Sequence, residues 1–167
     1  MENRVTLRPL GEGDVETLSL LANNRKIWDN VRDYFPHPYT EDNAREYIRL
    51  VSSGELKTIF GIQYDGLLCG CIGLHAQTDV YRLSAELGYW IGEPFWGKGI
   101  ASAAVGHVTV FGFEQLQLTR IFAGVFSFNS ASMKVLEHNG YLLEGISTKA
   151  VIKNGQVWDE HRYARTV

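Results

Sequence analysis

The segment of this sequence best suited to ligand chemistry is a glycine-rich turn, Trp96-Gly97-Lys98-Gly99-Ile100-Ala101, between an expected strand and an expected helix. Glycine lets the backbone turn sharply and approach a ligand closely. The free N–H groups at the start of the helix carry about half a positive charge from the helix dipole, which favours phosphate groups. The turn therefore predicts a pyrophosphate site, although glycines also occur where a chain only has to turn tightly.

Two well-known phosphate motifs do not fit this turn. The run Gly92-x-x-x-x-Gly97-Lys98 matches a P-loop except at its last place, where Gly99 replaces the Ser or Thr that holds Mg²⁺. The dinucleotide fingerprint fails too, because Ser102 stands at its sixth place and the turn follows a late strand, not the first. Nucleotide hydrolysis and hydride transfer are therefore disfavoured.

The elements that must position this turn follow from the spacing of apolar residues. We expect strands at residues 5–10, 58–64, 68–77, 83–91, 120–126, 141–152 and 156–164. We expect helices at 14–22, 40–53, 100–115 and 130–138, with a short helix and a loop at 28–39. Asp14 is typical of a helix cap, Asp65-Gly66 of a hairpin turn and Asn139-Gly140 of a helix end. This order predicts a mixed α/β sheet of six to seven strands with helices on both faces.

The composition narrows the class of protein. A chain of 167 residues fits a single domain, residues 1–167, and a net charge of −3 without a dense Lys/Arg stripe argues against nucleic acid. We find no apolar signal core or membrane-spanning run, so we expect a cytoplasmic protein. Cys69 and Cys71 would lie roughly 7 Å apart on one strand face, too far for a good disulfide. We expect both to be reduced core residues, with no metal site.

Two blocks of the chain resemble the GNAT acetyltransferase superfamily. The shape of its acetyl-CoA signature, Gln/Arg-x-x-Gly-x-Gly/Ala, lies over Trp96 to Ala101, with Gly99 and Ala101 matching and with Trp96 in place of the usual Gln or Arg. The block from Asn129 to Tyr141 is similar to the family's later helix and its Asn-Gly-Phe end. The string Ala-Glu-Leu-Gly-Tyr-Trp-Ile before the turn resembles the Rim-type branch, which includes ribosomal-protein N-terminal acetyltransferases.

The resemblance implies that the chain binds acetyl-CoA. Amides from Gly97 to Ser102 would hold the pyrophosphate, and the pantetheine arm would fill a gap between two splayed parallel strands. Asn129 would contact pantetheine, cap the following helix, or do both. Lys98 would contact phosphate or stay solvated. The residues implied to bind the cofactor are Trp90, Ile91, Gly92, Trp96, Gly97, Lys98, Gly99, Ile100, Ala101, Ser102 and Asn129.

The same resemblance names two candidate catalytic residues. Glu86 falls where many members carry a general base, a role that suits a partly buried carboxylate; the alternative is a structural carboxylate paired with an arginine or a loop amide. Ser132 matches a serine proposed in the Rim-type branch to protonate the departing thiolate, or is an ordinary first-turn helix residue. Leu136 stands where many members have a tyrosine, and Val151 is nearest to the place where this branch offers a carboxylate. His75 is a weaker candidate.

The expected reaction is transfer of acetyl from acetyl-CoA to a primary amine by direct attack in a ternary complex, with a protein or peptide N-terminal α-amine as the preferred acceptor. The segment Phe35-Pro-His-Pro-Tyr39 is aromatic and stiffened by proline, which favours either an acceptor-side loop or local packing. The alternatives are a small-molecule amine acetyltransferase, a longer acyl donor such as succinyl, and a non-catalytic acyl-CoA-binding module. Pairing of the final strands across a homodimer is also open.

Overall fold

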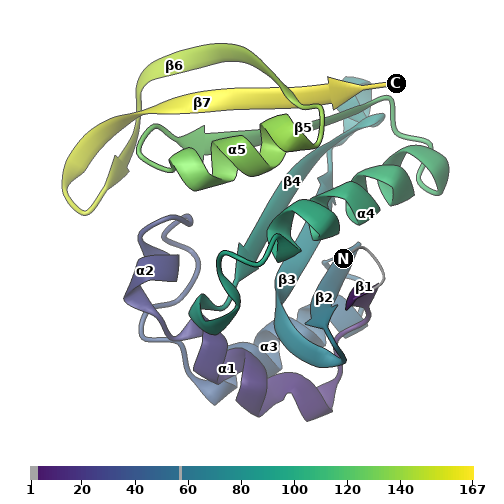
Figure 1. Cartoon of the computed structure of the whole chain (residues 1–167), viewed down its shortest axis with the longest axis vertical. Helices are drawn as coiled ribbons and strands as arrows, with labels where there is room; N and C mark the ends of the chain where they lie inside the picture. The colour runs from purple at the N-terminus through teal and green to yellow at the C-terminus, as the bar shows by residue number, and fades with distance from the viewer. Residues whose placement is uncertain (1–3, 57) are drawn as a thin grey trace.

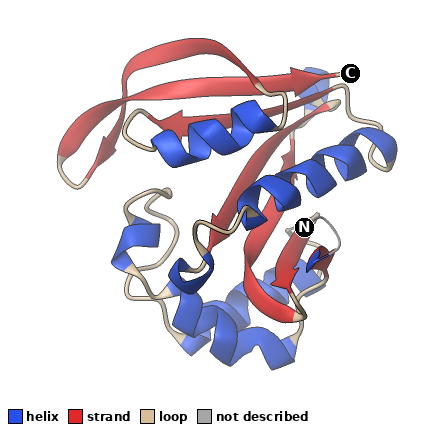
Figure 2. Cartoon of the chain, viewed as in Figure 1, coloured by secondary structure: helices blue, strands red, loops and turns tan. Residues whose placement is uncertain are grey.

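The computed structural model describes residues 4–56 and 58–167 and is built on one seven-stranded mixed sheet in the order β1-β2-β3-β4-β5-β7-β6 (Figure 2). The strands are β1 (Val5–Arg8), β2 (Ile59–Tyr64), β3 (Leu67–Ala76), β4 (Ser84–Ile91), β5 (Arg120–Phe126), β6 (Leu142–Lys153) and β7 (Gln156–Thr166). Strands β4 and β5 are parallel, and the other neighbouring pairs are antiparallel. The predicted mixed sheet is confirmed.

Helices cover both faces of this sheet, as expected (Figure 1). The helices are α1 (Val15–Ala22), α2 (Arg25–Trp28), α3 (Glu41–Ser52), α4 (Ile100–Glu114) and α5 (Ser130–His138). Residues of α4 and α5 such as Val108 and Leu136 pack with Leu87 and Ile121 in the larger buried cluster. Residues of α1 and α3 form the second cluster, against the side chain of Cys71 on the other face of β3. The side chains thus alternate between two apolar cores, which fixes the register of the central strands.

The two parallel strands part soon after they meet. Their register covers Ser84–Glu86 of β4 and Arg120–Phe122 of β5, and beyond it the strands diverge. Since β4 continues to Ile91 and β5 to Phe126, about half of each strand borders a gap rather than a neighbour. The splayed parallel strands expected from the family resemblance are confirmed.

Local turn chemistry accounts for most of the element ends. Asp65 and Gly66 have φ of 51° and 83° in the β2–β3 hairpin, a left-handed pair that favours Asn, Asp and Gly. Gly140, with φ of 76°, follows the C-cap Asn139 of α5, as predicted. Strand β1 ends at Arg8, earlier than expected, because Pro9 cannot donate to the sheet.

Two local predictions need correction. Asp14 is the N-cap residue of α1, as predicted, but its carboxylate makes no cap bond, because it binds the Arg8 guanidinium at 2.7 Å and accepts from the Gly11 N–H at 2.8 Å. The short helix expected within 28–39 is α2, which ends at Trp28 and begins after Asn24, whose side chain accepts from the Lys26 N–H. The expected single domain includes residues 1–3 and 57, which lie outside the described residues. Within the described ranges, no helix has both the length and the apolarity needed to cross a membrane.

Candidate active site

The gap between β4 and β5 exposes backbone groups of β4. Gly92 donates its N–H to the carbonyl of Cys69 at 2.7 Å, and the β3–β4 register is unbroken. Antiparallel strands alternate their bonding direction, so even-numbered residues of β4 bond to β3 and odd-numbered residues face β5. Beyond the last parallel pair, the residues whose backbone faces the gap are Leu87, Tyr89 and Ile91.

The facing backbone of β5 follows by the same reasoning. Ser127 donates its N–H to Asp159 on β7 at 3.0 Å, so odd-numbered residues of β5 bond to β7. Gly124 and Phe126 therefore turn their backbone toward the gap, where the Phe126 carbonyl already accepts from the Asn129 N–H at 2.8 Å. Backbone groups left without partners in a dry site cost free energy, so the gap suits an extended ligand that carries amides.

Of Trp90, Ile91 and Gly92, which the resemblance implies to bind the cofactor, Ile91 directs its backbone into the gap. Trp90 and Gly92 direct theirs toward β3. Trp96 folds back onto the same strand end, where its indole N–H donates to the Ile91 carbonyl at 2.6 Å. The tryptophan that replaces the family's Gln or Arg is therefore an anchor for the turn, and its ring stays 44% exposed.

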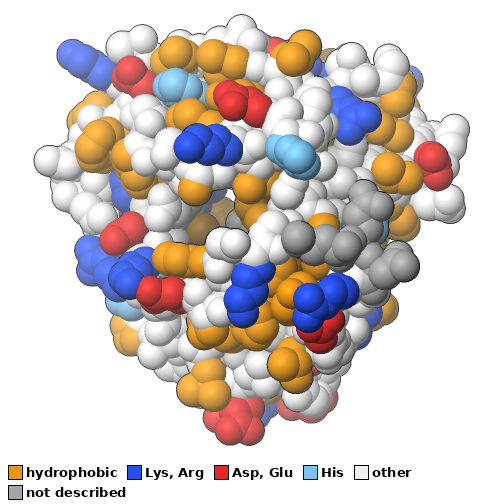
Figure 3. All heavy atoms as spheres, in the orientation of Figure 1, with side chains coloured by type: hydrophobic (Ala, Val, Ile, Leu, Met, Phe, Trp, Pro, Cys, Tyr) orange, Lys and Arg blue, Asp and Glu red, His pale blue; other side chains and the backbone are white. Residues whose placement is uncertain are grey.

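The glycine turn has the geometry expected of an anion site. Gly97 and Gly99 have φ of 74° and 73°, in the left-handed region that favours glycine, and Gly99 is the N-cap of α4. The first amides of α4, from Ile100 to Ser102, have no acceptor within the helix. Figure 3 shows the surface hollowed near its centre, with hydrophobic side chains inside the hollow.

Side chains near the turn are held by other parts of the fold. The Lys98 ammonium lies 5.4 Å from the centre of the Phe95 ring. The Ser102 hydroxyl accepts from the Asn139 side chain at 3.2 Å, which ties α4 to α5. Asn129 accepts from the Ser132 N–H at 3.2 Å, so its expected role as the N-cap of α5 is confirmed.

The candidate proton donor Ser132 has a partner that the sequence did not reveal. The Tyr89 hydroxyl lies 2.8 Å from the Ser132 hydroxyl. Burial raises the pKa of Tyr89 to about 12, and the bond to Ser132 only partly opposes this effect. Tyr89 is therefore protonated at neutral pH and can donate to Ser132. Neither local spacing nor composition would have linked a strand tyrosine to this helix.

The candidate base Glu86 lies on the other face of β4. Its carboxylate forms an ion pair with Arg32, and its side chain is 23% exposed. His75 is its register partner on β3. Burial lowers the pKa of His75, an effect that Glu86 opposes and Arg32 reinforces, so this imidazole is neutral at neutral pH. The structure therefore brings Glu86 together with Arg32 and His75, and places Ser132 with Tyr89 across the strand.

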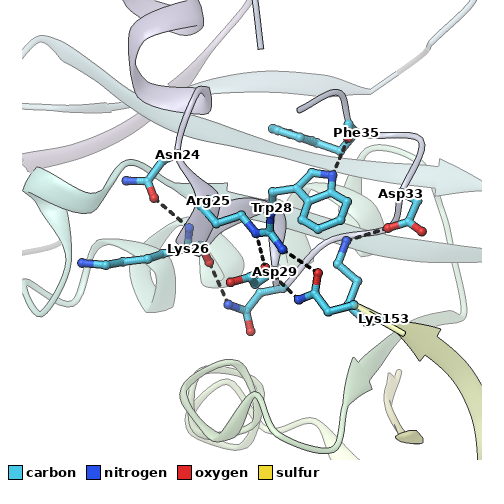
Figure 4. A network of polar contacts seen from close by, with 10 residues as sticks. Asn24, Arg25, Lys26, Trp28, Asp29, Asp33, Phe35 and Lys153 are labelled. Carbon is cyan, nitrogen blue, oxygen red and sulfur yellow. Dashed lines mark hydrogen bonds and ion pairs between the residues drawn. The ribbon is translucent and has the colours of Figure 1, made fainter. Parts of the chain in front are cut away.

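The segment from residue 25 to 39, here called the bridging segment, connects the two sides of the gap. It reaches β4 through Phe35, whose ring packs edge-on against Trp90 at 5.9 Å. It reaches the β6–β7 hairpin through Lys153, whose ammonium lies 2.7 Å from Asp33 and 3.4 Å from the centre of the Trp28 ring (Figure 4). The aromatic segment predicted to form an acceptor-side loop thus packs against β4.

A surface cavity of about 410 Å³ lies between α2 and this hairpin. Its aromatic wall consists of Phe128 and Trp158, whose rings are 4.8 Å apart. The other lining residues are Lys26, Asp29, Asn30, Lys153, Asn154 and Gln156.

The two cysteines of this chain take no part in a disulfide. Cys69 and Cys71 are buried free thiols, as predicted, and burial raises the pKa of Cys69 to about 11. In residues 4–56 and 58–167, no three His, Cys, Asp or Glu side chains gather in a way that would hold a metal ion.

Known proteins resemble this chain in sequence and in fold. The sequence model of the acetyltransferase (GNAT) domain matches residues 4–142. YdaF of Bacillus subtilis, provisionally named a ribosomal N-acetyltransferase, is 34% identical over 164 residues, covering 95% of this chain and 89% of that protein. Mycobacterium smegmatis RimJ, solved with CoA-disulfide, superposes with a TM-score of 0.88 at 25% identity, covering 98% of this chain and 82% of that chain. Vibrio cholerae spermidine N-acetyltransferase, solved with CoA and spermine, gives 0.83 at 25% identity, covering 98% and 96%.

Proposed function

The chain belongs to the GNAT acetyltransferase family and is an N-acetyltransferase, and on that premise we propose that it acetylates the α-amino group of a peptide or protein N-terminus. The observation that carries the proposal is the set of charged groups where the acceptor amine would bind. Glu86, at the gap, is already paired with Arg32, and we take the cavity beside the hairpin, which has no excess of carboxylates, as the acceptor pocket.

The donor in this proposal is acetyl-CoA, which supplies an acetyl group already activated as a thioester. The residues present fit it in two places. The left-handed Gly97 and Gly99 present the first amides of α4 to a pyrophosphate. The backbone of Leu87 and Ile91 on β4 and of Gly124 on β5 borders the gap that opens beyond the last parallel pair. An amide-bearing arm lying there would complete the interrupted sheet.

The acceptor class follows from the cost of removing a proton. An α-amino group titrates near 7.7–8.0, so deprotonation at pH 7 costs about 1 kcal/mol, whereas a lysine side chain costs nearer 4.6 kcal/mol. Arg32 already holds Glu86 in an ion pair, and the lowered pKa of His75 makes its imidazole a weak base, so these two groups suit an acceptor whose proton costs little to remove. An α-amine therefore suits these residues better than a lysine side chain does.

The cavity lining weighs against a polyamine. Its charged side chains are two lysines, Lys26 and Lys153, and one carboxylate, Asp29. A polyamine with several ammonium groups would favour an excess of carboxylates, whereas a peptide backbone can use Asn30, Gln156 and an aromatic wall. A polyamine is nevertheless the second candidate, because the similar Vibrio cholerae enzyme acetylates spermidine.

The test is release of CoA thiol from acetyl-CoA with a panel of amines at one pH. The panel contains peptides with free N-termini, the same peptides with blocked N-termini and an internal lysine, and spermine. We expect turnover with the free N-termini alone, with mass spectrometry placing the acetyl group on the α-nitrogen. Turnover of spermine or of the blocked, lysine-containing peptides in place of the free N-termini would refute the proposed acceptor.

A further inference from the structure

Glu160 on β7 lies against a glycine whose backbone faces the gap. A Cβ added to Gly124 would lie 2.7 Å from the Glu160 carboxyl carbon and 2.8 and 2.9 Å from its oxygens. Those separations are shorter than the non-bonded contacts that Cβ atoms make in proteins. The carboxylate therefore occupies the space that a side chain at position 124 would fill. Glycine at this position is therefore what allows Glu160 to lie directly over β5.

Strand alternation places Glu160 on the same face as Glu86. Glu86 and Phe122 are register partners across the parallel pair, so their side chains share one face, and Gly124 follows two residues later. Glu160 is the register partner of Phe126, on that same face. The two carboxylates therefore flank the point where β4 and β5 part, on the face opposite the Tyr89–Ser132 pair.

The two carboxylates differ in their partners. Glu86 is held by Arg32 in a close ion pair. Within the described residues, the ion pair of Glu160 is with Arg162, at 3.7 Å, which is longer than a hydrogen bond. The Glu160 side chain is only 16% exposed. A carboxylate that is partly shielded from water and loosely paired is available to bind an arriving ammonium group.

We propose that Glu160 is a catalytic residue that binds the ammonium form of the acceptor and takes one proton from it. The freed nitrogen lone pair forms the C–N bond to the acetyl carbonyl carbon as the C–S bond breaks. The nitrogen loses two protons in all. One passes through Glu160 to water, and the other balances the charge of the departing thiolate, so that the products are an amide and a thiol.

The carboxylate that the family resemblance implies falls nearest to Val151 on β6, and not at Glu160. Val151 is the register partner of Trp158 on β7, two residues before Glu160. The proposal rests on N-acetylation of an amine and does not depend on which amine is the substrate.

The experiment compares Glu160→Gln with the matched control Glu144→Gln, whose carboxylate is 40% exposed and pairs with Arg120 at 2.5 Å. Steady-state rates are measured with the best amine of the panel, and the Kd of acetyl-CoA is measured by titration. We expect kcat/KM for the amine to fall at least about 100-fold in Glu160→Gln, with the acetyl-CoA Kd unchanged. Glu144→Gln should match the wild type.

The pH profile separates proton transfer from a structural role. The charged groups on the same face of the sheet as Glu160 are the Glu86–Arg32 pair, the Arg120–Glu144 pair and Arg162. His75, on the same face, is neutral at neutral pH. Ser147, the register partner of Glu160 on β6, does not titrate. We expect the deficit of Glu160→Gln to shrink above the acceptor pKa of about 8, where water has already removed the proton.

Gly124→Ala gives an independent test, because its methyl group displaces the carboxylate without removing it. It should lower kcat/KM in the wild-type background and cause little further loss in Glu160→Ala, where the space is empty. The proposal is overturned if Glu160→Gln keeps more than a third of the wild-type kcat/KM. A deficit that is the same at every pH, together with weaker acetyl-CoA binding, would also overturn it. If spermine alone is turned over, the peptide proposal fails while the Glu160 comparison proceeds with spermine.

Discussion

Replacing Lys153 should separate the packing of its aliphatic stem from the effect of its charge. The side chain is 2% exposed, and its ammonium lies between Asp33 at 2.7 Å and the Trp28 ring at 3.4 Å. Lys153→Ala removes three buried methylene groups, worth about 0.8 kcal/mol each. It also removes a desolvated cation–π contact worth about 2 kcal/mol.

Two terms reduce this total. The ammonium no longer has to be withdrawn from water, and the Asp33 side chain, 67% exposed, rehydrates when its partner is lost. We therefore expect Lys153→Ala to lower the free energy of unfolding by about 3 kcal/mol. Lys153→Met keeps most of the stem and should cost about 1 kcal/mol.

Urea unfolding at 25 °C measures both values, with acetyl-CoA absent. A parallel assay measures the KM of the acceptor, which should rise in Lys153→Ala while the acetyl-CoA Kd stays constant, because Lys153 ties the bridging segment to the β6–β7 hairpin and not to the glycine turn. A loss below about 1 kcal/mol in Lys153→Ala, or an equal loss in Lys153→Met, would refute this reasoning.

Four further substitutions test other parts of the site. Tyr89→Phe and Ser132→Ala should each lower kcat, by about 10-fold or more, and the double variant should lose little beyond the worse single one, as a rate assay would show. His75 has a folded-state pKa below its unfolded value, so the unfolded chain binds the proton more readily and stability falls as pH drops below about 6.5; thermal unfolding of His75→Gln should be less sensitive to pH there. Gly99→Ala forces alanine into a φ of 73°, which should cost about 1–2 kcal/mol and weaken acetyl-CoA binding in titrations.

The sequence was sufficient for the elements that depend on local patterns. The strand at Arg120–Phe126 and the helix at Ser130–His138 occur at the predicted residues, because an apolar period and turn residues determine both. The glycine turn could also be predicted, because the left-handed backbone geometry at Gly97 and Gly99 favours glycine.

The contacts that complete the site could not be predicted from the sequence, because each joins distant parts of the chain. Arg32 and Glu86 are 54 residues apart, and Asp33 and Lys153 are 120 apart. Lys153 in particular resembles a solvated hairpin residue next to Asn154-Gly155, and its contacts with Trp28 and Asp33 come from a distant part of the chain. At Asp14 the local pattern predicted a cap of α1, but the carboxylate binds the nearby Arg8 guanidinium and makes no cap bond.

The parting of β4 and β5 also bears on how the protein behaves without its ligand. An ordinary open sheet has two edges, one on each side, and proteins protect them against strand addition. Here the divergence after Glu86 and Phe122 creates two more edges in the interior of the sheet. An extended segment from another chain meets the same backbone groups there as a ligand with amides does. We therefore expect the ligand-free protein to aggregate sooner on heating than the protein saturated with CoA, by an amount beyond what its lower melting temperature explains.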